Sequence, residues 1–160
     1  TRSRSSRART RSLHGRCLDA VFEVIQTIDL EGLEADRVYP RQVPVDRDIE
    51  LPCILVSPVG TETLPAGTFE DTDVGYPVTV WFISANNQDT RVREEELLWR
   101  EQVIDQFMDL PLLEIRGEAQ AWDVQVEPGP VVDPALWREQ NLLGGFITLR
   151  VQTRKDRGRP

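Results

Sequence analysis

Residues 76–84 constrain the fold more than any other segment, because an extended chain there is apolar on both sides. The segment reads Tyr-Pro-Val-Thr-Val-Trp-Phe-Ile-Ser, so two valines and a phenylalanine alternate with threonine, tryptophan and isoleucine. A strand with two apolar faces is typical of the interior of a sheet, where both faces are covered. We therefore predict a central strand at residues 76–84.

Periodicity predicts three further strands and two helices. The short apolar run at residues 51–56 indicates a buried strand. Residues 122–126 and 147–151 alternate apolar and polar side chains, as strands with one covered face do. Apolar side chains recur at helical spacing in residues 13–29 and again in residues 90–108, which predicts a helix in each segment.

The predicted fold class is α+β: a mostly antiparallel four-stranded sheet with two packed helices, in the order α-β-β-α-β-β. The last two strands are expected to be antiparallel, because no crossover helix of adequate length separates them. Residues 37–43 form a further candidate strand or edge segment that this order does not count. One domain is predicted at residues 13–152, between flexible basic arms at residues 1–12 and 153–160.

The connection over residues 57–75 is longer than most loops, and Pro65 and Gly67 interrupt it. An interaction loop, an extended hairpin tip and a disordered surface loop are all compatible with this composition. If it is an interaction loop, its candidate contact residues are Glu62, Phe69, Asp71 and Asp73.

Charge is distributed unevenly along the chain. Residues 1–16 contain six arginines and no acidic residue, whereas residues 17–150 contain 9 basic and 26 acidic residues. The whole chain therefore has a net charge of −8, while its middle has −17. Basic ends favour an anionic partner, and an acidic body repels one. The candidate contact residues in the two ends are Arg2, Arg4, Arg7, Arg9, Arg11, Arg154 and Arg157.

The arginine-rich ends have several interpretations. Four to six arginines could neutralise phosphates in a salt-dependent way, but residues 1–16 contain no aromatic side chain for base stacking. Docking of an end segment on the acidic surface of a neighbouring subunit accounts for both signs of charge. An organelle transit peptide and a codon bias towards arginine are the remaining alternatives.

Catalytic, metal and cofactor sites are not expected. His14 is the only histidine, and it lies in the basic N-terminal segment, away from a plausible triad. Cys17 and Cys53 have apolar neighbours, which predicts buried free thiols, and two cysteines with one histidine cannot complete a four-ligand zinc site. The carboxylates occur in runs typical of solvated surfaces. We therefore predict that the chain is not an enzyme, and it has no apolar run of the ~20 residues that span a bilayer.

Three large apolar residues are candidates for subunit contact. Trp99 lies at the border of the apolar stripe of the second predicted helix, and Leu98 lies outside that stripe. A neighbouring element of the core could equally cover both. Trp137 lies in the connection between the last two predicted strands.

Three segments carry a resemblance to a known family. The segments Leu51–Thr63, Asp73–Ile83 and Asn86–Asp89 resemble small neck proteins of tailed bacteriophages, and most of all the tail terminator (tail completion) proteins. The similarity is one of pattern over about residues 13–152. It comprises an N-terminal helix, a Leu-Pro strand, a long loop, a Tyr-Pro-Val strand, an acidic helix containing Arg-Glu-Glu-Glu-Leu-Leu-Trp-Arg, and two closing strands.

This resemblance implies a structural virion protein that forms a hexameric ring without a catalytic site or cofactor. Such a ring caps the tail tube, ends its polymerisation and joins the tail to the head. The implied partners are further copies of the chain, the tail tube protein and a head-completion or stopper protein, with DNA sliding unbound through an acidic lumen. The implied location is the virion neck, and the host cytoplasm during assembly. A head–tail adaptor or stopper, or a nucleic-acid-binding module using its arginines, remains an alternative.

Overall fold

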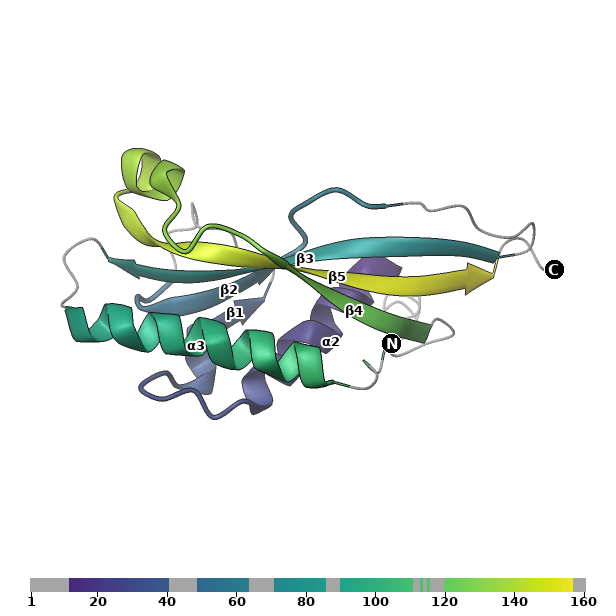
Figure 1. The fold of residues 1–160 in the computed structure, drawn as a ribbon, viewed down its shortest axis with the longest axis horizontal. Helices are drawn as coiled ribbons and strands as arrows, with labels where there is room; N and C mark the ends of the chain where they lie inside the picture. Colours follow the sequence, from purple (N-terminus) through teal and green to yellow (C-terminus); the bar gives the residue numbers. More distant parts are fainter. Residues whose placement is uncertain are drawn as a thin grey trace, which may run out of the picture.

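The computed structural model describes residues 12–40, 49–63, 71–85, 90–110, 113, 115 and 120–156. Within them one twisted sheet carries two long helices on the same side (Figure 1). The elements are, in chain order, α2 (Leu13–Thr27), η1 (Ala35–Arg37), β1 (Val38–Pro40), β2 (Cys53–Ser57), β3 (Asp71–Ala85), α3 (Thr90–Asp109), β4 (Gln120–Pro128), η2 (Leu136–Gln140) and β5 (Leu142–Asp156). η1 is a turn of 3-10 helix and η2 a short π-helix.

The sheet has five strands in the order β1-β2-β3-β5-β4 and is mixed, because β1 and β2 are parallel while the other pairs are antiparallel. The predicted four-stranded, mostly antiparallel sheet in the order α-β-β-α-β-β is therefore wrong. The uncounted strand is β1, which has three residues and ends at Pro40. A segment this short shows no alternation of apolar and polar side chains, so periodicity cannot reveal it. The predicted number of helices is also too low, because the prediction did not include the helical turns η1 and η2.

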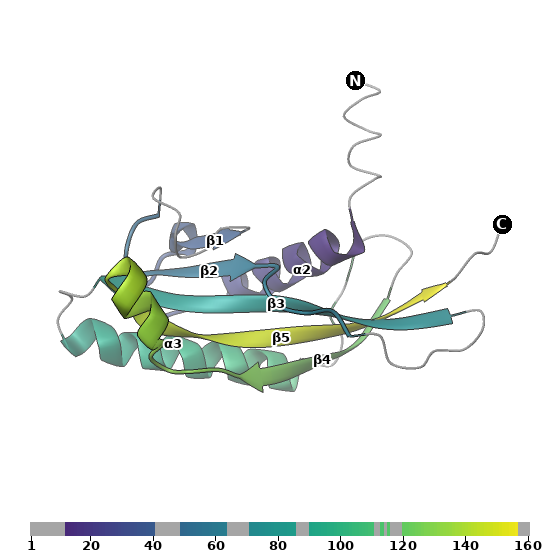
Figure 2. The same cartoon turned by 90° about the horizontal axis from the view of Figure 1, so that it is seen from above.

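The central position predicted for residues 76–84 is confirmed, because β3 lies between β2 and β5. β3 and β5 pair from Asp71 opposite Asp156 to Ala85 opposite Leu142. In Figure 2 the beginning of β3 and the end of β5 extend beyond the two helices α2 and α3. β5 continues to Asp156, so the first residues of the expected C-terminal arm belong to this strand. The residues of the arms at 1–11 and 157–160 lie outside the described part.

The main core lies between the helices and one face of the sheet. α2 contributes Leu18 and Ile25 to this core, and α3 contributes Trp99, Val103 and Phe107. Each large side chain buried in this way stabilises the fold by about 1.5–3 kcal/mol. The helix predicted at 13–29 begins as expected, where the Ser12 hydroxyl accepts a hydrogen bond from the Gly15 amide at 3.0 Å.

A second, smaller core lies on the outer face of the sheet. Cys53, Leu55 and Ile83 are fully buried there beneath Leu136 of η2. The chain reaches η2 by crossing over the start of β5 at Gly145, where a Cβ atom would collide with the carbonyl oxygens of Pro130 and Val131. At the adjacent Gly144 a Cβ atom would collide with the carbonyl oxygen of Phe82 in β3. The Gly144-Gly145 pair thus permits a close backbone approach at the entry to a strand.

Candidate interaction surfaces

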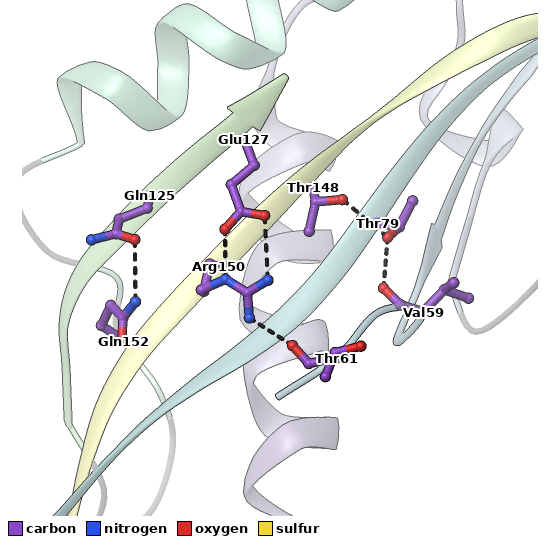
Figure 3. Close-up of polar contacts among 8 residues, drawn as sticks. All are labelled: Val59, Thr61, Thr79, Gln125, Glu127, Thr148, Arg150 and Gln152. Atoms are coloured by element: carbon purple, nitrogen blue, oxygen red, sulfur yellow. Dashed lines mark hydrogen bonds and ion pairs between the residues drawn. The ribbon is translucent and has the colours of Figure 1, made fainter. Parts of the chain in front are cut away.

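Part of the outer face carries a ladder of paired polar side chains (Figure 3). Arg150 on β5 donates from Nε to Glu127 Oε1 on β4 at 2.6 Å and from Nη2 to Glu127 Oε2 at 3.3 Å. Its Nη1 also donates to the carbonyl oxygen of Thr61 at 2.7 Å. Arginine suits this role because its planar group presents several donors in a fixed geometry. One side chain therefore joins β5, β4 and the segment that follows β2.

Two further contacts continue the ladder. The Thr79 hydroxyl donates to the carbonyl oxygen of Val59 at 2.7 Å and lies 3.5 Å from the Thr148 hydroxyl. The Gln152 amide donates to Gln125 Oε1 at 3.3 Å. This half of the outer face is thus a polar surface whose groups bond to one another within the chain.

The first part of the predicted loop 57–75 is held against β3. Thr63 exchanges two backbone hydrogen bonds with Gly75, at 3.0 and 2.9 Å. The ring of His14, in α2, has its Nε2 2.6 Å from the carbonyl oxygen of Pro77 and its Nδ1 3.9 Å from Glu62 Oε1. Residues 58–63 therefore follow β3 closely, and the side chain of Glu62 is still about half exposed.

The acidic end of that predicted loop is part of a strand. Asp71 and Asp73 belong to β3, where they lie opposite Asp156 and Arg154. Phe69 lies outside the described residues, and so do the side chains of both aspartates. Arg154 is exposed on β5.

Three exposed apolar side chains lie in η2 or shortly before it. Val131, Val132 and Trp137 are each at least half exposed, and Val131 lines a small hollow together with Leu97 of α3. Trp137 thus lies at the surface, where contact with another subunit requires it. We name Val131, Val132 and Trp137 the η2 patch.

A buried arginine holds the segment that carries the η2 patch. Arg100 of α3 donates to the carbonyl oxygens of Gly129 at 2.7 Å and Phe146 at 3.1 Å. Burial lowers the pKa of this guanidinium from its ordinary value. No local pattern singles out Arg100, because Leu98 is also one position from the buried Trp99 and is exposed. Arg150 and Glu127 could not be predicted either, because only the strand register brings them together.

The two candidates on α3 have different surroundings. Leu98 is exposed, as subunit contact requires, and Met108 is the most exposed large apolar side chain of those described. Trp99 is fully buried, and its Nε1 donates to the carbonyl oxygen of Glu31 at 2.6 Å. Trp99 is therefore a core residue, because the connection between α2 and η1 covers it.

The described residues hold no group of three or more histidine, cysteine or acidic side chains that could bind a metal ion. Cys17 and Cys53 are buried and free, as predicted. Burial raises the pKa of each thiol from 9.0 to about 12, so both are protonated at neutral pH. None of the described helices has the length and apolar character that a membrane span needs.

The remaining predicted contact residues, Arg2, Arg4, Arg7, Arg9, Arg11 and Arg157, lie outside the described part of the chain. Comparison with protein-family models found no match. Comparison with curated proteins found no similar sequence.

Proposed function

We propose that the protein is a structural component of a bacteriophage neck that assembles into a ring. The observation that carries this proposal is the exposure of apolar side chains at two separate places: the η2 patch, and Met108 near the C-terminal end of α3. Subunits of a cyclic ring contact one another head to tail, so each needs two different contact surfaces. The η2 patch brings three exposed apolar side chains into one short segment, and exposed apolar side chains grouped in this way mark interaction surfaces.

Among neck proteins we propose the tail terminator on the strength of the sequence resemblance. The segments that carry this resemblance form α2, β2, β3, α3, β4 and β5, and the fold contains η1, β1 and η2 in addition. In this proposal six copies form the ring, which caps the tail tube, ends its polymerisation and binds the head-completion or stopper protein. The acidic middle of the chain suits a lumen through which DNA slides without binding. The assembled protein resides in the virion neck, and the function requires no catalysis and no cofactor.

The oligomeric state tests the first part of the proposal. Native mass spectrometry of the purified chain should give six times the mass of one chain, and negative-stain images should show rings. Trp137→Ser should reduce the ring fraction without unfolding the chain, because this side chain is exposed. A chain that stays monomeric at high concentration and is absent from virions would refute the proposal.

Binding to the tail tube separates a terminator from an adaptor or stopper. The purified chain, added to polymerising tail tube protein, should shorten the tubes and appear at one end of each. An adaptor or stopper ring would leave tube length unchanged. A nucleic-acid-binding module would instead bind short duplex DNA at low salt and lose that binding when residues 1–12 are removed.

A further inference from the structure

Arg138 in η2 is an exposed cation next to the exposed ring of Trp137. Its guanidinium makes no hydrogen bond or ion pair with any other residue that the structure describes. The more buried arginines differ, since Arg100 and Arg150 donate to carbonyl or carboxylate oxygens of the chain. Tryptophan and arginine are among the residue types that contribute most to binding energy at protein interfaces. This pair therefore marks the η2 patch as a place where a partner with a carboxylate can bind.

The C-terminal end of α3 presents the complementary combination of side chains. Met108 is 69% exposed, and the partly exposed Ile104 lies four residues before it, on the same side of the helix. Asp105 is exposed three residues before Met108, and it has no hydrogen bond or ion pair within the described part of the chain. We name Ile104, Asp105 and Met108 the α3 end surface. It offers an apolar side chain and an anion side by side.

The η2 patch and the α3 end surface cannot meet within one copy. Leu97 of α3 lines the same hollow as Val131, and Met108 lies eleven residues further along the helix, about 16 Å away along its axis. Figures 1 and 2 both show η2 towards the end of the molecule where α3 begins. A contact between the two surfaces therefore joins two copies, and it can repeat from copy to copy, as in a ring.

We propose that the η2 patch and Arg138 of one copy bind the α3 end surface of the next copy. This inference rests on the proposed ring and names the surfaces that meet in it. In this contact Trp137 packs on Met108, because a thioether sulfur and an aromatic ring attract one another. Arg138 pairs with Asp105, and this match of opposite charges fixes the orientation of the two copies.

Charge and apolar character together select the α3 end surface as the partner. Exposed large apolar side chains also occur at Val59, Leu97 and Leu98. Leu97 lies beside the η2 patch of its own copy, and Leu98 directly follows it. No acidic residue lies within two positions of Val59 in the sequence. Among the exposed apolar side chains that the structure describes, Met108 is therefore the one that is distant from the patch and has a carboxylate beside it.

Crosslinking in the full-length chain tests the contact. Cys17 and Cys53 are buried, so thiols introduced at the surface are the ones that react. The test variant carries Glu139→Cys and Asp109→Cys, two exposed positions next to the two surfaces, and it keeps every contact residue. A short bis-maleimide reagent should convert its rings into covalent species from dimer to hexamer in denaturing gels. Each single variant should stay monomeric in the same gels, because its thiol lies on only one side of the contact.

A matched control moves one thiol elsewhere on the acidic surface. It combines Glu139→Cys with Glu34→Cys, because Glu34 is an exposed carboxylate at the start of η1. Native mass spectrometry first establishes that the test and control variants form rings as the unaltered chain does. The control should then give no covalent oligomers. If it crosslinks as strongly as the test variant, the reagent reports random collisions and the evidence for this contact is overturned.

Charge exchange tests the ion pair. Arg138→Glu alone, and Asp105→Arg alone, should each raise the protein concentration needed for half assembly by roughly five- to tenfold, because an exposed attraction becomes a repulsion. The variant with both changes should assemble nearly as well as the unaltered chain, since each contact again joins opposite charges. Sedimentation velocity measures the three variants. If the double variant assembles no better than the single ones, Arg138 does not pair with Asp105.

The outcomes separate this contact from the proposed ring. If the unaltered chain and the test variant form rings but the test variant gives no covalent oligomers, the ring stands and this contact is refuted. If Glu139→Cys alone gives abundant covalent dimers, the η2 patch meets a second η2 patch and the inference is wrong. If the unaltered chain stays monomeric at high concentration, the ring and this contact both fail.

Discussion

The face of the sheet that α2 and α3 cover differs from its outer face in what its side chains contact. On the covered face Val80, Phe82 and Leu149 are buried in the main core. On the outer face, aliphatic side chains are buried beneath η2, and beyond them the surface is a ladder of paired polar groups. The first face supplies most of the folding energy through apolar burial. The outer face leaves side chains accessible on a sheet that holds them in place, and a surface of this kind is suited to contact with another subunit.

The largest expected effect concerns the covered face. Trp99→Ala removes a fully buried side chain and should lower the free energy of unfolding by about 3–5 kcal/mol. Trp137→Ala is the matched control on the outer side of the molecule, because this tryptophan is 54% exposed. Its change in stability should stay within about 0.5 kcal/mol. Urea titration of both variants measures the free energy of unfolding. An equal loss in the two variants would contradict the difference between the covered face and the outer face.

The next effect concerns the arginine that connects the two regions. Arg100→Met keeps much of the side-chain volume but leaves the carbonyl oxygens of Gly129 and Phe146 without their donor. The expected loss is about 2–3 kcal/mol, since hydrogen bonds to charged groups are involved. Hydrogen exchange should increase at residues 129–137 more than in β3. A uniform increase would show that Arg100 does not hold this segment specifically.

The thiols give an effect that depends on pH. One of them, Cys17, belongs to the covered face, and the other, Cys53, to the small core of the outer face. Their pKa values are raised by burial from 9.0 to about 12, so the folded chain binds these protons more tightly than the unfolded chain. Their stabilising effect is complete below pH 9 and is lost as the pH rises towards 12.

Each thiol should therefore lower stability by about 1.4 kcal/mol per pH unit above 9. Urea titrations at pH 8 and pH 10 measure this slope for the unaltered chain and for Cys53→Ala. The alanine variant should start from a lower stability at pH 8 and fall less steeply. An unchanged slope would show that Cys53 ionises in the folded chain as readily as in the unfolded one.

The smallest effect concerns the polar ladder. A double-mutant cycle of Arg150→Met and Glu127→Gln should give a coupling energy of about 1 kcal/mol, because the glutamate is partly exposed to solvent. The Gln125 and Gln152 pair serves as a neutral comparison on the same strands. A coupling energy near zero in 0.1 M salt would mean that the polar ladder contributes little to the stability of the fold. The outer face would then be stabilised mainly by the small core beneath η2.

Much of this fold was accessible from local patterns, as particular elements illustrate. The helix predicted at 13–29 forms α2, and the one at 90–108 forms α3, because both place apolar side chains at helical spacing in the main core. Strand β1 was not counted, because three residues carry no period. Among the candidate contacts, Leu98 and Trp137 are exposed while Trp99 is buried. Trp99 is buried because the connection that contains Glu31 covers this side of α3, whereas Leu98 is not covered.

The sequence by itself determined the central strand, the two long helices, the burial of both cysteines and the opposite charges of the ends and the middle. These properties depend on neighbouring residues or on composition, which are present in the chain before it folds. Only the tertiary structure decided the parallel edge strand, the contacts of Arg100 and Arg150, and the exposure of Trp137. These depend on segments far apart in the sequence, and the free energy of bringing such segments together is not encoded in any local pattern.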